Sequence, residues 1–206
     1  MALTRHLVIF SRSPRLGTGK RRLAKDIGEV QALRFQRVML DITLRRLAPD
    51  SRWAISLAVA PDGCGNWPPE LKVVFQGRGD LGQRMANVAR ELPPGPVVIV
   101  GSDIPDIAPN HIAKAFRALG DNDAVFGPAT DGGYWLVGLR RRPRFLDPFA
   151  GVRWSSVHAL ADTLANLAGR RVAFVDLLSD VDDGDSLRRQ PNWGVLHRAK
   201  FGGRNS

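Results

Sequence analysis

The chain is poor in the features that mark secreted and membrane-spanning proteins. It has one cysteine, Cys64, so no disulfide can form within it. No apolar run approaches the roughly 20 residues that a transmembrane helix needs. The N-terminal apolar stretch, Leu7 to Phe10, is much shorter than the hydrophobic region of a signal peptide. We therefore expect a cytoplasmic protein without a membrane span.

The chain also lacks internal repeats, low-complexity segments and any linker long enough to separate two domains. Its 206 residues, 44% of them hydrophobic, suffice for one domain with a sizeable core. We expect a single domain over residues 1–206, ending in a flexible basic tail of about ten residues. The sequence does not indicate an oligomeric state.

Acidic side chains are absent from the first 25 residues, which hold seven basic ones. The whole chain has 30 Lys and Arg against 20 Asp and Glu, a net charge of +10. This excess predicts anionic partners such as phosphates, nucleotides or nucleic acid. A second basic cluster is interpreted as solvated surface: Arg140, Arg141, Arg142 and Arg144.

Strand-like and helix-like segments alternate along the chain. The expected strands are His6–Ser11, Trp53–Ala60, Leu71–Phe75, Pro96–Gly101, Asp123–Phe126, Tyr134–Leu139 and Val172–Val175. The expected helices are Glu29–Leu47, Leu81–Leu92, Pro109–Leu119, Ser155–Leu167 with Ser155 or Ser156 as N-cap, and a last one from Gly184. This alternation predicts a three-layer α/β/α fold with a mostly parallel central sheet.

Ligands of such sheets bind at the carboxyl ends of the strands. A basic loop with glycines, from Ser11 to Leu23, follows the first strand. Its glycines allow close approach of a ligand, and Lys20 and Arg22 are suited to neutralise phosphates. The loop matches neither a P-loop nor a dinucleotide-binding pattern. Taken alone, it is equally well explained as a solvated basic turn.

Asp103 directly follows the very apolar strand Pro96–Gly101. A carboxylate placed there is costly unless it has a partner. Mg²⁺ and Mn²⁺ prefer oxygen ligands and commonly bridge carboxylates to substrate phosphates. We therefore interpret Asp103 as a candidate metal ligand.

Two later segments carry further polar groups. Asp131-Gly132-Gly133 is typical of a hairpin turn, although Tyr134 and Trp135 after it are suited to face a sugar ring. An acidic cluster then precedes the last helix, and some of its members are expected to cap that helix. Another member is expected to reach Asp103 and complete a two-carboxylate metal site. The members are Asp180, Asp182, Asp183 and Asp185.

These residues together resemble a known bacterial family. The ordered motifs are Lys20–Leu23, Gln76 with Asp80–Arg84, Gly101–Pro105, Gly127–Tyr134, Trp154-Ser155 and Asp180–Asp182. They are similar to GT-A-fold glycosyltransferases, some named for arsenosugar biosynthesis, of the nucleotide-diphospho-sugar transferase superfamily. That family is related to guanylyltransferases acting on phospholactate or phosphoenolpyruvate. Each motif is weak alone, but six in order, spanning about Leu7 to Leu187, are fairly specific.

The resemblance implies roles for individual residues. Asp103 and Asp182 are the implied ligands of Mg²⁺ or Mn²⁺, with Asp180 as the alternative to Asp182, and Lys20, Asp103 and Asp131 are the implied catalytic residues. The implied nucleotide-binding residues are Ser11, Arg15, Lys20, Arg22, Gln76, Asp80, Gly82 and Arg84. The implied acceptor- or sugar-binding residues are Gly132, Gly133, Tyr134 and Trp154.

The chain departs from the family pattern at two positions. Arg21 stands where the family usually has Thr, and Ser186 stands where it usually has an acid. The second change is expected at most to weaken a helix cap. Because of both departures, an inactive family member that only binds nucleotide remains an alternative interpretation.

Two activities fit these residues about equally. One is glycosyl transfer from an NDP-sugar to a small-molecule acceptor, and the family resemblance favours it. The other is nucleotidyl transfer from an NTP to a phosphorylated acceptor with release of pyrophosphate, and the basic first loop favours it. A nucleic-acid-binding module would explain the charge, but no motif for reading nucleic acid is present.

Overall fold

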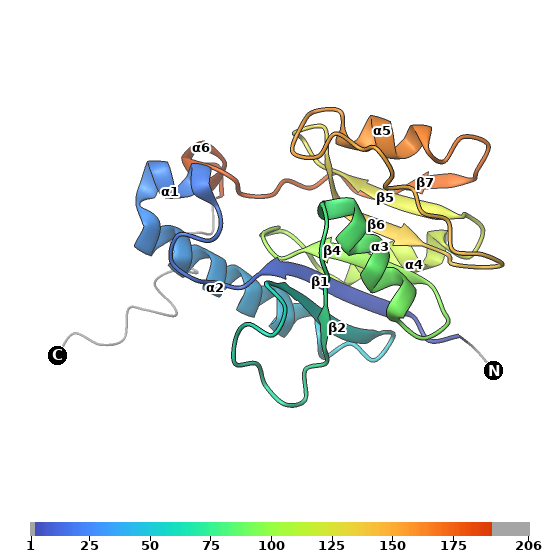
Figure 1. The fold of residues 1–206 in the computed structure, drawn as a ribbon, viewed down its shortest axis with the longest axis horizontal. Coiled ribbons are helices and arrows are strands. Elements are labelled where there is room, and N and C mark those ends of the chain that lie inside the picture. The colour runs from blue at the N-terminus through green and yellow to red at the C-terminus, as the bar shows by residue number, and fades with distance from the viewer. Residues whose placement is uncertain (1–2, 191–206) are drawn as a thin grey trace.

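The structure is a computed structural model, and it describes residues 3–190. In this described part of the chain, seven strands form one sheet in the order β3-β2-β1-β4-β6-β5-β7 (Figure 1). The strands are β1 (His6–Arg12), β2 (Ala54–Ala60), β3 (Val73–Phe75), β4 (Val97–Gly101), β5 (Ala124–Pro128), β6 (Tyr134–Leu139) and β7 (Val172–Phe174). All neighbouring pairs are parallel except the two that β6 makes with β4 and β5.

Within residues 3–190, six helices accompany the sheet. They are α1 (Arg21–Ile27), α2 (Glu29–Leu47), α3 (Leu81–Glu91), α4 (Pro109–Ala118), α5 (Ala159–Ala165) and α6 (Gly184–Arg188). No helix among residues 3–190 has both the length and the apolar character needed to cross a bilayer. The expected basic C-terminal tail lies outside the described residues.

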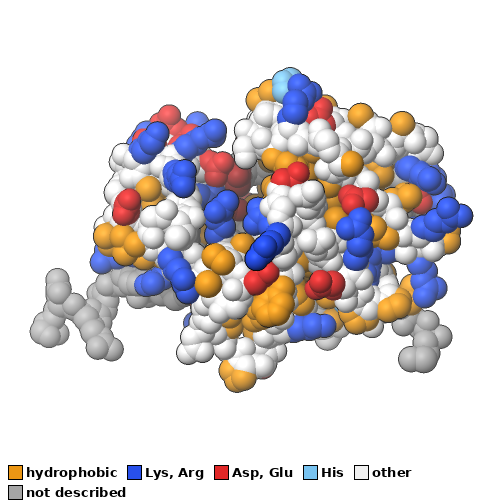
Figure 2. Space-filling view, in the orientation of Figure 1, with side chains coloured by type: hydrophobic (Ala, Val, Ile, Leu, Met, Phe, Trp, Pro, Cys, Tyr) orange, Lys and Arg blue, Asp and Glu red, His pale blue; other side chains and the backbone are white. Residues whose placement is uncertain are grey.

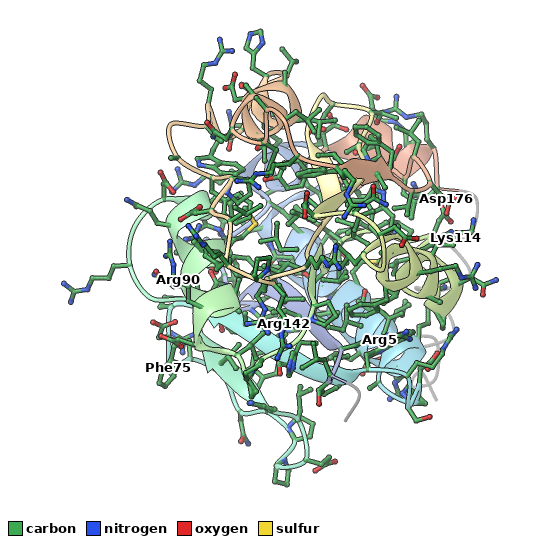
Figure 3. All side chains as sticks on the ribbon, turned by 90° about the vertical axis from the view of Figure 1, so that its right-hand side faces the viewer. Arg5, Phe75, Arg90, Lys114, Arg142 and Asp176 are labelled. Atoms are coloured by element: carbon green, nitrogen blue, oxygen red, sulfur yellow. The ribbon has the colours of Figure 1, made fainter. Side chains whose placement is uncertain are left out.

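Alternating residues of the central strands supply two separate cores, one on each face of the sheet. Leu7 and Ile9 of β1 pack with α2 and α4, whereas Val8 packs with α3 and α5. On the first face, Lys114 of α4 also pairs with Asp176, which follows β7 (Figure 3). Helices on both faces confirm the predicted three-layer fold with a mostly parallel sheet.

A third, smaller apolar cluster lies apart from the sheet. It joins α1, the first half of α2 and α6, and is built around Leu23, Phe35 and Val181. Figure 1 shows α1 and α6 side by side at one end of the molecule. We call this part the α1/α6 end.

Two sequence-based expectations about helices are wrong. The expected helix Ser155–Leu167 is only Ala159–Ala165, because Ser155 has a positive φ of 58° and His158, not a serine, is the N-cap. Helix α1 was not expected, since its basic sequence was interpreted as a loop. Both errors concern short segments whose structure depends on tertiary contacts more than on periodicity.

Candidate functional site

Three carboxylates from two distant parts of the chain meet at the carboxyl end of β4. Oxygen atoms of Asp103, Asp180 and Asp182 lie within 4.8 Å of one another. The backbone N–H of Val181 donates to the carbonyl of Asp103 at 3.2 Å, which joins the two segments. The side chain of Val181 is fully buried in the cluster of the α1/α6 end, so its two neighbours project to the other side of the chain.

The α1/α6 end fixes where Asp182 lies. Asp26 of α1 accepts a hydrogen bond from the N–H of Gly184 at 2.7 Å, and Asp183 caps α6 through the N–H of Ser186. The hydroxyl of Ser186 accepts from the N–H groups of Asp182 and Asp183, each at 3.0 Å. Serine thus completes the cap that was expected to be weakened at this position.

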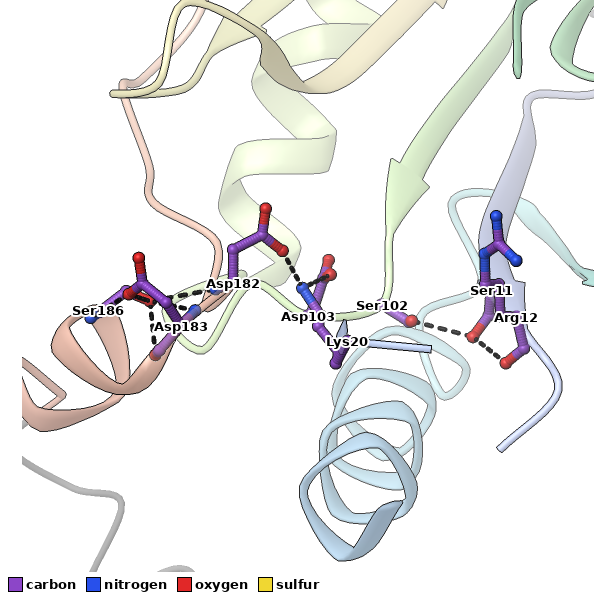
Figure 4. Close-up of polar contacts among 8 residues, drawn as sticks. All are labelled: Ser11, Arg12, Lys20, Ser102, Asp103, Asp182, Asp183 and Ser186. Atoms are coloured by element: carbon purple, nitrogen blue, oxygen red, sulfur yellow. Dashed lines mark hydrogen bonds and ion pairs between the residues drawn. The ribbon is translucent and has the colours of Figure 1, made fainter. Parts of the chain in front are cut away.

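Lys20 lies between the carboxylates of Asp103 and Asp182 (Figure 4). Its Nζ is 2.5 Å from Oδ1 of Asp182 and also forms an ion pair with Asp103. Burial by itself would lower the pKa of Lys20, but the two carboxylates outweigh it and raise that pKa above its ordinary value. The ammonium is therefore charged at neutral pH.

Asp180 completes the cluster without a described ion pair of its own among residues 3–190. Burial, followed by the nearby carboxylates of Asp182 and Asp103, raises the pKa of Asp180 to about 6. One ammonium facing three carboxylates leaves the cluster net negative at neutral pH. Oxygen-only donors with excess negative charge fit Mg²⁺ or Mn²⁺.

Asp131 lies in the hairpin loop between β5 and β6, as the turn interpretation predicts. Its Oδ1 accepts from the N–H of Gly133 at 2.9 Å. Thr130 of the same loop contacts Ser179 at 3.2 Å, and the charge of Asp131 contributes to the raised pKa of Asp180. The loop therefore borders the carboxylate cluster, and the Asp131 side chain is exposed there.

Gln76 is buried and holds the ends of two strands together. Its Nε2 donates to the carbonyls of Ser11 at 3.0 Å and Ala58 at 2.8 Å, while its Oε1 accepts from Arg84 at 2.9 Å. Both hydrogens of the Gln76 side-chain amide are thus used within the protein, and none is left to donate to a nucleotide. Gln76 therefore holds together the strand ends where the nucleotide was expected. Asp80 is the N-cap of α3, because its carboxylate accepts from the N–H of Gln83.

Gly82 is required by packing between α3 and the segment before α5. A Cβ at this position would lie 2.6 Å from the Trp154 ring and 2.7 Å from Cβ of Phe149. The Trp154 ring also packs edge-on against Tyr134, with centroids 6.4 Å apart. Tyr134 is largely buried, which raises the pKa of its hydroxyl above the ordinary value. Trp135 is buried and donates to the carbonyl of Asp176, so it does not offer a face to a sugar.

The expected metal, nucleotide and acceptor groups are neighbours at one edge of the sheet. Ser102, beside Asp103, donates to the Ser11 hydroxyl at 3.0 Å, and Trp154 joins Gly82 to Tyr134. Figure 2 shows acidic and basic side chains close together where the α1/α6 end meets the rest of the molecule. Arg15 and Arg22 are exposed, and within the described part of the chain neither makes an ion pair.

Three supporting residues were not found from the sequence. Ser102 joins β4 to β1, Asp26 holds α6, and Arg46 of α2 donates to the carbonyls of Pro105 and Ile107 in the loop that carries Asp103. Each acts on a partner far away in the sequence, and no local motif signals such a contact.

One solved structure is similar over almost the entire chain. It is a candidate nucleotide-diphospho-sugar transferase from Desulfovibrio desulfuricans G20, 27% identical, with a TM-score of 0.82 and coverage of 96% of both chains. The Mycobacterium tuberculosis H37Rv protein Rv0371c has 17% identity and a TM-score of 0.58, covering 92% of this chain and 98% of its own.

A third similar structure is glucosyl-3-phosphoglycerate synthase from Mycobacterium tuberculosis, solved with Mn²⁺, UDP and glucosyl-3-phosphoglycerate. It is 11% identical with a TM-score of 0.53, and the match covers 98% of this chain and 81% of the synthase. The two Mycobacterium tuberculosis proteins, at 17% and 11% identity, share the fold of this chain, and the likeness shows nothing more. No curated protein matches the chain.

A family profile matches residues 42–156. This region contains Asp103, Gln76 and Asp131, whereas Lys20 and Asp182 lie outside it. Together with the fold shared with nucleotide-diphospho-sugar transferases, the match confirms the resemblance drawn from the sequence motifs. The chain belongs to DUF2064, a family described as uncharacterized protein conserved in bacteria.

Proposed function

We propose that the protein is a metal-dependent transferase that moves a glycosyl group from an NDP-sugar to a small-molecule acceptor. The observation that carries the proposal is the meeting of Asp103, Asp180 and Asp182 beside Lys20 at the carboxyl end of the central strands. Anionic substrates of α/β sheets bind at this edge. The fold shared with nucleotide-diphospho-sugar transferases supports the same conclusion.

The candidate ligands of Mg²⁺ or Mn²⁺ are Asp103 and Asp182, and Asp180 lies close enough to contribute a third oxygen. When bound, the ion would supply electrostatic stabilisation of the charge that develops on the leaving diphosphate. Lys20 would bind the same phosphates through its ammonium.

The other residues have supporting roles in this proposal. The strand-end groups tied together by Gln76 and Arg84 form the nucleotide side. Asp131 and the aromatic pair of Tyr134 and Trp154 border the acceptor side, where the exposed Asp131 carboxylate is placed to orient an acceptor hydroxyl or accept its proton.

Nucleotidyl transfer is the second candidate. The observation that favours it is the dense positive charge at the end of β1 and in the loop after it, which supplies more cations than a diphosphate requires: Arg12, Arg15, Lys20 and Arg22. The same carboxylates and the same lysine would then serve attack on the α-phosphate of an NTP.

The two activities differ in their products. The purified protein is incubated with Mg²⁺ or Mn²⁺, panels of NDP-sugars and NTPs, and candidate hydroxyl and phosphate acceptors. NDP release supports glycosyl transfer, and pyrophosphate release supports nucleotidyl transfer. Stabilisation against heat that needs nucleotide and Mn²⁺ together tests the shared site when the acceptor is unknown.

Asp103→Ala should abolish turnover and the Mn²⁺-dependent stabilisation. Asp106→Ala is the matched control, because Asp106 is an exposed carboxylate of the same loop that lies outside the cluster. Full activity of Asp103→Ala would refute both candidate activities. Tight binding to unstructured RNA with a steep salt dependence would instead favour a nucleic-acid-binding module.

A further inference from the structure

The Lys20 ammonium lies where a metal ion would bind. Its Nζ contacts Oδ2 of Asp103 and is 2.5 Å from Oδ1 of Asp182. Figure 4 shows the lysine between the two carboxylates, with dashed lines to both. The Lys20 side chain is only 11% exposed, so these ion pairs are partly buried and differ from the mobile ion pairs of a protein surface.

An ion and this ammonium exclude each other. Mg²⁺ and Mn²⁺ bind carboxylate oxygens at about 2.0 to 2.2 Å. An ion bridging the same two carboxylates would therefore occupy nearly the same point as Nζ. The ion and the Lys20 ammonium are both positively charged, and charges this close repel strongly in a partly buried site. The Lys20 ammonium must therefore leave when the ion enters.

The backbone around Lys20 is suited to such a movement. Lys20 is the N-cap of α1 and has a left-handed conformation, with φ 46° and ψ 46°, that non-glycine residues adopt at a cost of about 1 kcal/mol. Gly17, three residues earlier, has a positive φ of 73°, and a Cβ added there would have nothing within 4 Å. The four-carbon side chain can swing while α1 stays packed on α2 and α6.

We propose that Lys20 is a placeholder cation, which holds Asp103 and Asp182 together in the ion-free protein and is displaced onto substrate phosphate when a divalent ion binds. This inference rests on the proposed metal site. It makes the binding of ion and phosphate cooperative, because the ion frees the Lys20 ammonium from the carboxylates and phosphate then offers it a new anionic partner.

The first test measures Mn²⁺ alone, without nucleotide, by calorimetric titration of the full chain. Lys20→Met removes the competing charge, so its Mn²⁺ affinity should rise about tenfold over the wild type. Lys25→Met is the matched control, because Lys25 is an exposed lysine of the same helix, and it should change the affinity less than about twofold. Equal or weaker Mn²⁺ binding by Lys20→Met would overturn the proposal.

The second test adds inorganic pyrophosphate together with Mn²⁺. Lys20→Met should bind pyrophosphate about tenfold more weakly than the wild type, opposite in sign to its effect on Mn²⁺ alone. A loss of affinity for both ligands would show that Lys20 only maintains the structure, which contradicts the placeholder role.

A third measurement uses the wild type and does not depend on the folding of a variant. The chain has five lysines, so the side-chain ammonium signals in a nitrogen-correlated NMR spectrum can be assigned with Lys20→Arg. The Lys20 signal should be protected from exchange in the ion-free protein and lose this protection on addition of Mg²⁺. A signal unchanged at saturating Mg²⁺ would contradict displacement.

The failures of the two proposals are distinguishable. If the wild type and Lys20→Met bind Mn²⁺ equally, the metal site stands and the placeholder role is refuted. If neither protein binds Mn²⁺, the metal site and the placeholder role are both refuted.

Discussion

At the residue scale, Gly101 leaves room for the metal-site carboxylate. A Cβ on Gly101 would lie 2.8 Å from Oδ1 of Asp103, which folds back over it. Gly101→Ala should displace the carboxylate and lower Mn²⁺ affinity by about tenfold, with little change in melting temperature, because a side-chain end yields more easily than backbone. Calorimetric titration and thermal unfolding measured together check this. Unchanged Mn²⁺ affinity would show that the carboxylate position is unimportant.

Asp180 lowers the stability of the ion-free folded protein in a pH-dependent way. The folded protein raises the pKa of Asp180 from 3.8 to about 6, so the folded state binds more protons than the unfolded state between these values. Stability should therefore fall as the pH rises through this window, and the full cost, on the order of 3 kcal/mol, is present above it.

Asp180→Asn should remove the loss of stability that the ionised Asp180 carboxylate causes. With divalent ions chelated, the variant should be more stable than the wild type at neutral pH, and the difference should vanish below the unfolded-state pKa of 3.8, where Asp180 is protonated in both states. Denaturant unfolding across the pH range measures it. A stability difference that does not vary with pH would contradict the stated origin.

At the element scale, the loop between β5 and β6 is held against the segment before α5. Gly132 has φ 86°, and a Cβ there would lie 2.4 Å from the carbonyl oxygen of Val157. Gly132→Ala should cost about 3 kcal/mol of unfolding free energy and move Asp131. Gly151→Ala is the matched control, because Gly151 has φ 66° and nothing within 4 Å, so it should cost only about 1 kcal/mol. Equal costs would exclude the Val157 collision as the cause.

In the second basic cluster Arg141 has a structural role, whereas Arg142 and Arg144 are exposed. Arg141 donates to the carbonyls of Ala89, Leu92, Pro93 and Gly95, so it caps the end of α3. Arg141→Ala should destabilise the protein by about 2 kcal/mol in denaturant unfolding. Arg142→Ala changes an exposed side chain (Figure 3) and should stay within about 0.5 kcal/mol. A comparable loss in both variants would contradict the capping role.

How far the sequence predicts the protein depends on the range of the interactions. All seven strands and the long helices were predicted because their apolar periodicity is local. The helix start at Pro109 was also predicted, since Pro favours the first helical position. Helix α1 was missed because its stability comes from contacts with α2 and α6, which leave no periodic signal in seven residues.

The candidate site follows the same division. The strand-end rule leads from the sequence to Asp103, and the later acids to Asp180 and Asp182, which the structure brings together. The contact of Lys20 with these carboxylates and the internal hydrogen bonds of Gln76 were not predicted. Both depend on side-chain geometry, which composition and spacing do not encode: the Lys20–Asp182 contact spans 162 residues of chain, and the Gln76 hydrogen bond to Ser11 spans 65.

At the scale of the whole molecule, the net charge of +10 should govern how anions arrive. Raising the salt concentration from about 0.05 M to about 0.3 M should weaken nucleotide binding severalfold, because screening shortens the reach of the distributed arginines. Calorimetric titration at several salt concentrations checks this. Affinity that does not vary with salt would show that only contacts within the site matter.

The order of the elements along the chain has a consequence for biosynthesis. Every strand of the sheet ends by Phe174, whereas Asp180 and Asp182 come afterwards. On the ribosome, the sheet can therefore assemble when Asp103 is the only one of the three clustered carboxylates that has been translated. We expect a nascent chain stopped after β7 to form the sheet but not to bind Mn²⁺, because Asp180 and Asp182 are still missing.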